Sequence, residues 1–204
     1  MKGNFITLEG IEGSGKSTSL NTITEILTER NIDFIITKEP GGGPLGKDLR
    51  SMLLSKSSQI SPEVELLLMM ADRKNHIDNL VMPNINKGVW VISDRYLDST
   101  YAYQGGGRQI NTSKIDSLVR LLDLPQPNLT LLFDLSPSIA LDRAKKRSEL
   151  DRFESEPMDF HERIRDAYVS LYEDNPERFR MIDSSADFIA VKKQVEKIVL
   201  EFIG

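Results

Sequence analysis

The sequence predicts a three-layer α/β/α fold built on a five-stranded parallel sheet. Short apolar segments alternate with longer segments whose apolar residues recur at helical spacing, which is the order that produces parallel sheets. Strand segments such as residues 129–133 are apolar almost throughout, as expected of strands that are covered on both faces. The chain has 204 residues, of which 39% are hydrophobic, so a single domain over residues 1–204 is expected.

Five strands and a first helix are expected in order along the chain. The strands are expected at residues 4–9, 34–37, 89–92, 129–133 and 179–182. The first helix is expected at residues 15–30, where Leu20, Ile23 and Leu27 share one face. Ligands of such folds bind beyond the carboxyl ends of the strands, so the residues just after each strand are expected to carry the function.

Two further helices are expected to begin where a serine precedes a proline, at residues 61–62 and 136–137. Serine caps a helix and proline suits its first turn. Apolar residues at helical spacing also predict helices over residues 160–171 and 195–202. The helix that begins at residue 62 is expected to point four apolar side chains inward, namely Val64, Leu67, Leu68 and Ala71.

The composition excludes several classes of function. The absence of cysteine excludes disulfides, thiolate metal sites and cysteine nucleophiles. The net charge of −5 argues against nonspecific nucleic-acid binding. The apolar run near the amino end is too short for a secretory signal, and no stretch reaches the roughly 18 apolar residues of a membrane span. A cytoplasmic protein that binds neither nucleic acid nor membrane is therefore expected.

A phosphate-binding motif follows the first strand. Residues 10–17 read GIEGSGKS and match G-x-x-x-x-G-K-[ST], in which glycines let backbone N–H groups converge on phosphate oxygens. A chance match is expected in about 1% of chains of this length, and here the motif lies between a predicted strand and a predicted helix. We interpret it as the triphosphate loop of a P-loop NTPase fold, with Lys16 on the β- and γ-phosphates and the Ser17 hydroxyl on Mg²⁺. The residues expected to bind the nucleoside triphosphate are Gly10, Ile11, Glu12, Gly13, Ser14, Gly15, Lys16, Ser17 and Thr18.

The residues after the third strand also suit phosphate chemistry. Asp94 lies where P-loop enzymes hold a magnesium-side carboxylate, and Arg95 beside it suits a phosphate clamp. The alternative is an ordinary salt bridge at the end of a strand. Position favours the functional reading, because ligands of such folds bind at this edge.

Three other features have a functional and a structural interpretation. Arg50 follows the glycine-rich loop after the second strand and is either a solvated residue or a phosphate ligand. Residues 103–108 resemble a glycine loop, in which Gln104 offers both a donor and an acceptor to the edge of a base. The isolated histidines, His76 and His161, are expected to be structural or surface residues.

A cationic segment follows the fourth strand. Arg143 and Arg147 lie four residues apart on one helical face, and Arg152 follows them. Such a face is most often simply solvated. In phosphoryl transfer, however, mobile arginines stabilise the charge on the transferred group, so a lid over about residues 143–157 is the functional alternative.

Together these residues resemble the thymidylate kinase family of P-loop nucleoside-monophosphate kinases. The resemblance runs the length of the chain through EGIEGSGKST, KEPGG, ADR, SDRYLDST-YAYQGGGR and ELDRFE. It implies phosphorylation of dTMP to dTDP with ATP and Mg²⁺, and a homodimer. It implies catalytic roles for Lys16, Arg95, Arg143, Arg147 and Arg152, and magnesium ligation by Ser17 and Asp94. The dTMP-binding residues that it implies are Glu12, Glu39, Pro40, Arg50, Met69, Arg73, Arg95, Ser99, Tyr103 and Gln104.

The resemblance also assigns finer roles. Arg50 and Arg95 correspond to clamps on the dTMP phosphate, and Arg73 and Gln104 to readers of the thymine edge. Tyr103 corresponds to the tyrosine that crowds the 2′ position of the sugar. The phosphate loop contains no arginine, so the chain resembles the bacterial type of the family, whose arginines lie in the lid. One departure concerns residue 69, where many relatives have a phenylalanine that stacks on the base and this chain has methionine.

The residues alone leave other functions open. The nearest is a P-loop kinase for another nucleoside monophosphate or a deoxynucleoside. A nucleotide-dependent switch is a second class, although guanine-specific switches carry N-K-x-D and this sequence does not. A binding module without catalysis is a third, and the retained Lys16, Ser17 and Asp94 argue against it.

Overall fold

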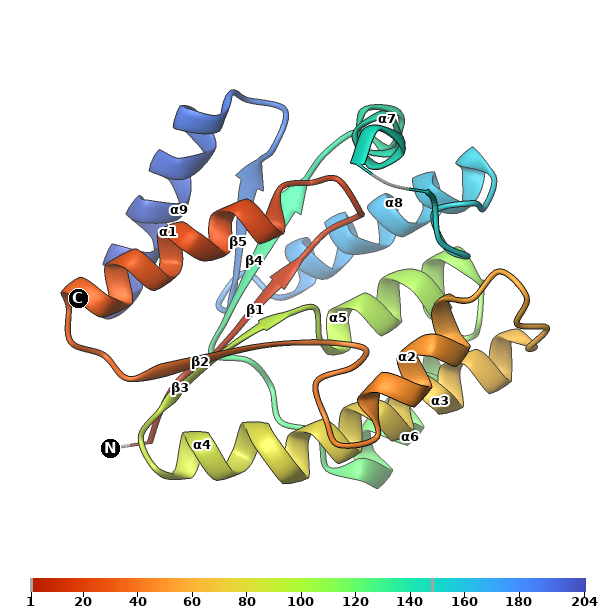
Figure 1. Ribbon diagram of the computed structural model, residues 1–204, viewed down its shortest axis with the longest axis horizontal. Helices are drawn as coiled ribbons and strands as arrows, with labels where there is room; N and C mark the ends of the chain where they lie inside the picture. Colours follow the sequence, from red (N-terminus) through yellow and green to blue (C-terminus); the bar gives the residue numbers. More distant parts are fainter. Residues whose placement is uncertain (1, 148) are drawn as a thin grey trace.

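The computed structural model describes residues 2–147 and 149–204. Within them, five parallel strands form one sheet in the order β2-β3-β1-β4-β5 (Figure 1). Each lies within two residues of its predicted bounds, which confirms the predicted sheet. The strands are β1 (Phe5–Glu9), β2 (Phe34–Lys38), β3 (Trp90–Asp94), β4 (Leu129–Asp134) and β5 (Phe179–Asp183).

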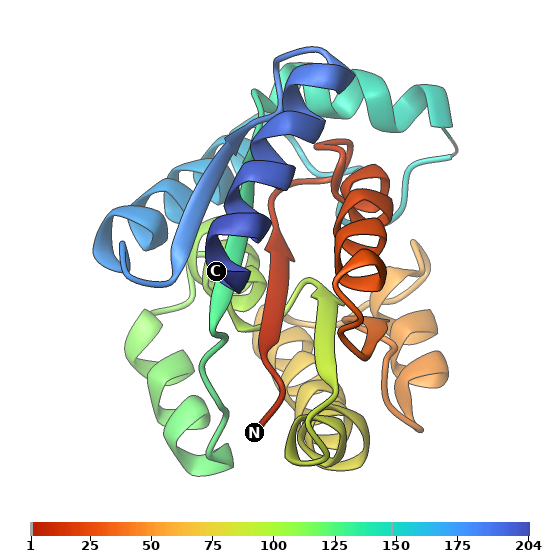
Figure 2. The same cartoon turned by 90° about the vertical axis from the view of Figure 1, so that its left-hand side faces the viewer.

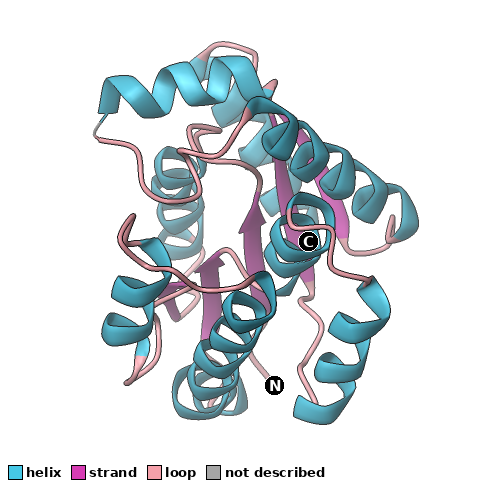
Figure 3. Cartoon of the chain, turned by 90° about the vertical axis from the view of Figure 1, so that its right-hand side faces the viewer, coloured by secondary structure: helices cyan, strands magenta, loops and turns pink. Residues whose placement is uncertain are grey.

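Helices cover both faces of the sheet, because successive strand residues point to opposite sides (Figure 2). Ile6 and Leu8 of β1 pack against α1 (Lys16–Glu29) and α9 (Phe188–Ile203), which lie side by side on one face. Phe5 packs against the helices of the opposite face. Figure 3 shows helices on both sides of the strands. The helices of this opposite face are α3 (Pro62–His76), η1 (Ile77–Val81), α4 (Met82–Asn86), α5 (Leu97–Thr100) and α6 (Thr112–Leu122).

A third apolar cluster lies at the β4–β5 side of the molecule. It contains Leu132 and Phe179 from the strands together with Phe160, Ile164 and Tyr168 of α8. The helices that complete the chain are α2 (Gly46–Leu54), α7 (Pro137–Arg147) and α8 (Met158–Asp174). The connections from β1 and β4 leave toward opposite edges of the sheet, and ligands of open α/β folds bind in the crevice above such a point.

The start of α3 is as predicted, but its inward face is not. Ser61 caps the helix by accepting a hydrogen bond from the Val64 N–H at 3.3 Å. Val64 and Leu67, however, are 43% and 55% exposed, Ala71 is exposed, and Leu68 is only partly buried. The prediction that all four point inward is wrong, because the buried face of α3 carries polar side chains. These are Glu65, Asp72, Arg73 and His76, which accompany Leu66 and Met70.

The glycine run at residues 105–107 is helical. The loop expected at 103–108 is a π-helical turn, η2 (Tyr101–Gly107), which continues directly from α5. A Cβ added at Gly106 would lie 2.7 Å from the Ala167 Cβ and 2.8 Å from the Arg163 backbone oxygen in α8. Glycine is therefore needed here for close packing of η2 on α8 and not for a flexible loop.

No helix within residues 2–147 and 149–204 combines the length and apolar character needed to cross a membrane.

Candidate active site

The loop between β1 and α1 is wrapped around the side chain of Lys16. The Lys16 Nζ donates to the backbone oxygens of Gly10 and Ile11, both at 2.9 Å. Gly13 has a φ of 77°, and a Cβ there would lie 2.4 Å from the Ala140 backbone oxygen, so the loop requires glycine. The first turn of α1 carries no acidic residue, which leaves its N–H groups suited to an anion.

Lys16 is a buried cation that is short of negative charge. Burial, followed by the neighbouring Arg95 charge, lowers the pKa of Lys16 to about 8, although Asp94, Glu12 and Glu9 act in the opposite direction. A polyphosphate beside the ammonium group would supply the missing negative charge. The loop is therefore electrostatically suited to the ligand that its sequence predicts.

A cavity of about 400 Å³ gathers most of the predicted residues, and its size suits a small-molecule site. Gly10 and Ile11 do not line it, but their carbonyl groups bind Lys16. Arg152 does not line it either, and the prediction for the Arg147 side chain lies outside what the structure describes. The predicted residues that line the cavity are Glu12, Gly13, Ser14, Gly15, Lys16, Ser17, Thr18, Glu39, Pro40, Arg50, Met69, Arg73, Asp94, Arg95, Ser99, Tyr103, Gln104 and Arg143.

Other lining residues were missed by reasoning from the sequence. Asp72 and Thr100 each adjoin a predicted residue, so their place in the ADR and LDST segments was the available signal. Phe153 lies within ELDRFE, where an isolated aromatic residue in a polar segment was the signal. The remaining missed residues are Leu54, Ala144, Asp151 and Glu154.

Arg95 connects the phosphate loop to α5, η2 and α8. Its Nη2 donates to the Glu12 Oε1 at 2.6 Å and to the Tyr103 hydroxyl at 3.0 Å. Its Nη1 donates to the Ser99 Oγ and the Tyr168 hydroxyl, both at 3.1 Å. The backbone of Arg95 has a φ of 71°, a left-handed conformation that is uncommon for a residue other than glycine. The guanidinium is thus held firmly at the edge of the cavity.

Glu12 is kept ionised by the same contacts. Burial alone would raise its pKa, but the Arg95 and Lys16 charges and the Tyr103 hydrogen bond outweigh burial and lower the pKa to about 2. The Tyr103 hydroxyl donates to the Glu12 Oε2 at 2.6 Å. Glu12 therefore carries a full negative charge inside the phosphate loop at neutral pH.

A second carboxyl group, that of Glu9, is linked to Arg95 through the Ser99 hydroxyl. It accepts hydrogen bonds from the Ser99 Oγ at 2.6 Å and the Tyr168 hydroxyl at 2.9 Å. Burial, together with the nearby Asp98 charge, raises the pKa of Glu9 to about 7, against the influence of Arg95. Ser99 is predicted to contact the acceptor, and its hydrogen bond to Glu9 fixes the orientation of its hydroxyl group.

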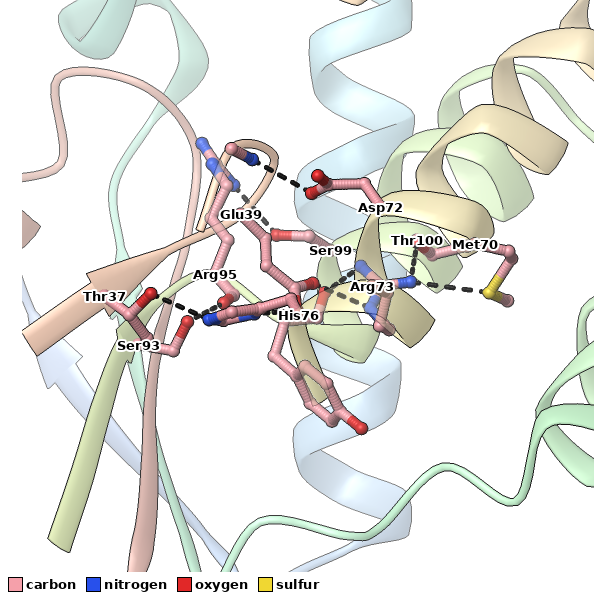
Figure 4. A network of polar contacts seen from close by, with 12 residues as sticks. Thr37, Glu39, Met70, Asp72, Arg73, His76, Ser93, Arg95, Ser99 and Thr100 are labelled. Carbon is pink, nitrogen blue, oxygen red and sulfur yellow. Dashed lines mark hydrogen bonds and ion pairs between the residues drawn. The ribbon is translucent and has the colours of Figure 1, made fainter. Parts of the chain in front are cut away.

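Arg73 lines the cavity and is fixed in a buried polar network (Figure 4). Its Nε donates to the Glu39 Oε2 at 2.8 Å, and its two terminal nitrogens bond the Thr100 hydroxyl and the Tyr96 backbone oxygen. The other oxygen of Glu39 lies 2.8 Å from the His76 Nδ1. His76 is fully buried, as is His161, so both histidines are structural and neither is a surface residue. Glu39 therefore positions Arg73 as a rigid set of donors.

The loop after β2 is tied to α2 and α3. Arg50 folds back so that its Nη1 donates to the Pro40 backbone oxygen at 2.8 Å. The Gly41 N–H donates to the Asp72 Oδ2 at 2.9 Å. These contacts hold the loop against the cavity with the Arg50 guanidinium at its wall.

Gln104 borders the cavity from η2 and is 1% exposed. Its Nε2 donates to the Glu65 Oε1 in α3 at 2.8 Å. Met69, on the same helix, also lines the cavity. An amide, a guanidinium and a flexible thioether therefore meet at this end of the cavity, which suits a planar base with polar edges.

The residues predicted to hold Mg²⁺ fit a metal that is bound mainly through phosphates. The Asp94 Oδ1 is buried and has no hydrogen-bond partner among the described residues, and Asp94 lines the same cavity as Ser17. The described part of the chain has no group of three or more acidic, histidine or cysteine side chains arranged to hold a metal. Mg²⁺ commonly takes one or two protein ligands and completes its shell with phosphate and water.

The predicted lid arginines lie in different places. Arg143 borders the cavity, and its Nη1 lies 3.5 Å from the Gly13 backbone oxygen and 3.3 Å from that of Ser184. Arg152 is turned the other way, because its Nε donates to the Leu53 backbone oxygen at 2.8 Å and its Nη1 pairs with Glu65 at 2.8 Å. In this arrangement only Arg143 of the two can reach a phosphate in the cavity.

A triphosphate loop that shares its cavity with a second set of arginines places the chain in the P-loop class of phosphoryl-transfer proteins. Known proteins narrow that class. The family model described as thymidylate kinase matches residues 8–195. The chain belongs to the thymidylate kinase family.

Its relatives match over nearly their whole length. A thymidylate kinase of Carboxydothermus hydrogenoformans is 46% identical over 205 residues, covering 100% of this chain and 97% of that protein. One of Nitrosomonas europaea is 41% identical over 202 residues, covering 98% and 94%. A crystal structure of thymidylate kinase from Ehrlichia chaffeensis superimposes with a TM-score of 0.80 at 32% identity, covering 98% of this chain and 99% of that one.

Proposed function

We propose that this protein transfers the γ-phosphoryl group of ATP to the phosphate of dTMP, forming dTDP, with Mg²⁺ as cofactor. The observation that carries the proposal is one cavity that is lined both by the phosphate loop with Lys16 and by a second set of arginines, Arg50, Arg73 and Arg95. Gln104 lines the same cavity and offers hydrogen-bonding groups to a base. Family membership supports the same assignment.

The chemistry follows from charge and position. Donor and acceptor phosphates repel each other, and Lys16, Arg50 and Arg95 offset that repulsion and hold the two groups in line. When bound, Mg²⁺ would neutralise charge on the phosphate oxygens, with Ser17 and Asp94 as its protein ligands. The acceptor oxygen of dTMP is itself the nucleophile, so no protein nucleophile is required.

The segment at residues 143–157 acts as the lid in this proposal. Its closure would exclude water, which would otherwise accept the phosphoryl group. Arg143 is better placed for the transition state than Arg152, the other lid arginine whose side chain the structure describes, because Arg143 borders the cavity beside the phosphate loop. A role for Arg152 in the transition state would require its contacts with Leu53 and Glu65 to break.

A coupled assay with ATP and a panel of acceptors tests the proposal. We expect dTMP to be phosphorylated with the highest kcat/KM, ahead of dUMP, dCMP, dGMP, AMP and thymidine. Higher kcat/KM for a different monophosphate or for an unphosphorylated deoxynucleoside would contradict it. The panel also measures how Met69 affects the tolerance for other bases.

Gln104→Ala is expected to weaken base selectivity more than maximal rate. Losing one hydrogen bond to the base should lower the dTMP to dCMP ratio of kcat/KM by about 10- to 100-fold, while kcat for dTMP falls less. Initial rates with each acceptor provide the measurement, and Gln104→Met serves as a control of similar size. An unchanged ratio in both variants would show that Gln104 does not read the base.

The proposal includes a homodimer formed through the outer face of α3. Val64 and Leu67 expose apolar surface there, on the side of the helix away from the buried polar residues. Sedimentation velocity should give a species of twice the 23.1 kDa chain mass, and Leu67→Glu should shift it toward the monomer. A single 23.1 kDa species for the unmodified chain would contradict the dimer.

A cytoplasmic location, where ATP is available, also belongs to the proposal and is tested by cell fractionation.

A further inference from the structure

Glu65 is a buried carboxylate that lies behind the cavity and not in its wall. It is 1% exposed and does not line the cavity. Its oxygens receive the Gln104 Nε2 at 2.8 Å, the Arg152 Nη1 at 2.8 Å and the Arg108 Nε at 3.2 Å. Two guanidinium groups and one amide thus converge on a single carboxylate.

This arrangement fixes which way the Gln104 amide faces. An ionised carboxylate can only accept hydrogen bonds, and a glutamine amide has its donors on Nε2 and its acceptor on Oε1. The Nε2 must therefore face Glu65, and a flipped amide would bring two acceptor oxygens together. No described residue donates to the Gln104 Oε1, and Gln104 lines the cavity. The Gln104 Oε1 is therefore the atom of this amide that can accept a hydrogen bond from a ligand in the cavity.

We propose that Glu65 is a specificity-determining positioning residue, which acts through Gln104 to present an acceptor to the base. The inference rests on the proposed function, in which Gln104 reads the base edge. Thymine offers an N–H donor at N3 and an acceptor at O4, whereas cytosine offers an acceptor at N3 and a donor at N4. Gln104 Oε1 and the donors of Arg73 complement the thymine pattern. Both pairings become repulsive with cytosine.

Arg108 supports Glu65 without touching Gln104. Besides Glu65, it pairs with Glu156 through its Nη1, and its guanidinium lies 4.7 Å from the centre of the Phe160 ring. Arg108 therefore contributes to the same buried network but leaves the Gln104–Glu65 hydrogen bond in place when it is replaced. Replacing Arg108 therefore tests the contribution of the buried network to stability without changing the orientation of the Gln104 amide.

The test compares Glu65→Gln with Gln104→Ala, using the dTMP to dCMP ratio of kcat/KM. A glutamine at residue 65 has the same shape but can donate, so the Gln104 amide can flip and present its NH₂ to the cavity. We expect the ratio to fall about tenfold or more in Glu65→Gln, with a smaller change in kcat for dTMP. In the double variant Glu65→Gln/Gln104→Ala the ratio should match that of Gln104→Ala alone, because the two changes remove the same interaction with the base.

Arg108→Met is the matched control. It should lower the midpoint of thermal unfolding while the ratio stays within about threefold of the unmodified protein. If Glu65→Gln does not fold, Glu65→Met/Arg108→Met removes the carboxylate together with one of its two guanidinium partners, while Arg152 keeps its hydrogen bond to the Leu53 backbone oxygen. The same fall in the ratio is expected in that variant.

Two outcomes would overturn the inference in distinguishable ways. If Gln104→Ala lowers the ratio and folded Glu65 variants keep it, the inference fails while the proposed base-reading role of Gln104 stands. If Gln104→Ala leaves the ratio unchanged, the role of Gln104 fails and the inference falls with it.

Discussion

Lys16→Ala is expected to lower kcat by about 10³-fold or more and to leave the fold intact. The ammonium group is the one cation that the phosphate loop itself supplies, and it lies within 2.9 Å of the Gly10 and Ile11 carbonyl oxygens at the centre of the loop. Removing a single positioned donor from a site where charge develops typically costs about 10²- to 10³-fold, and a full charge is worth more.

The expected stability of this variant follows from the pKa of Lys16. A lysine whose pKa is lowered on folding, here to about 8, is a charge that the folded state holds unfavourably. Its removal should therefore not lower the thermal midpoint. Steady-state kinetics with saturating dTMP give kcat, and circular dichroism monitors the fold. Turnover within about tenfold of the unmodified protein would refute the role assigned to Lys16.

Arg95→Ala is expected to have an effect of similar size, mainly on the acceptor. Arg95 holds Glu12 at 2.6 Å and lines the same cavity as Lys16, so its loss removes the fork that would bind the dTMP phosphate. We expect kcat/KM for dTMP to fall by about 10³-fold or more, with a higher KM for dTMP and a smaller change in the KM for ATP. Initial rates with each substrate varied in turn separate these contributions.

A second variant distinguishes lost chemistry from lost stability. Removing Arg95 leaves the Glu12 carboxylate in a largely buried site without its partner, which should cost about 1–3 kcal/mol of stability. Arg95→Met/Glu12→Gln removes both charges, so the thermal midpoint should recover while activity does not. If activity recovers together with stability, Arg95 is a structural residue and does not bind the acceptor.

The sheet and its phosphate loop were predictable because local chemistry specifies them. Segments such as residues 129–133 are apolar almost throughout because both faces of the strand are covered, and GIEGSGKS has few uses other than binding phosphate. Position at the end of a strand was also informative, since Asp94 ends β3, Arg95 follows it, and both line the cavity.

The errors have a shared physical cause, which is that tertiary contacts determine whether a given residue is buried and which conformation its segment adopts. Val64 and Leu67 suggested the inward face of α3, but the site requires polar groups such as Glu65 and Arg73 on that face. The glycine run before Arg108 suggested a loop, although Gly106 serves close packing against α8. The contact between Arg152 and the buried Glu65 likewise could not be foreseen from the sequence, and the role predicted for Arg152 stays a prediction. No local pattern encodes such distant partners.

Lys16 and Arg95 each have hydrogen-bond partners within the protein, and this affects how substrates bind. Lys16 donates to the carbonyl groups of its own loop, and Arg95 pairs with Glu12. A nucleotide phosphate therefore replaces an existing partner, and the net gain from each exchange is far smaller than the strength of the new contact. We expect moderate affinity for the nucleotides as a result, which lets the diphosphate product dissociate and leaves more of the binding energy for the transition state.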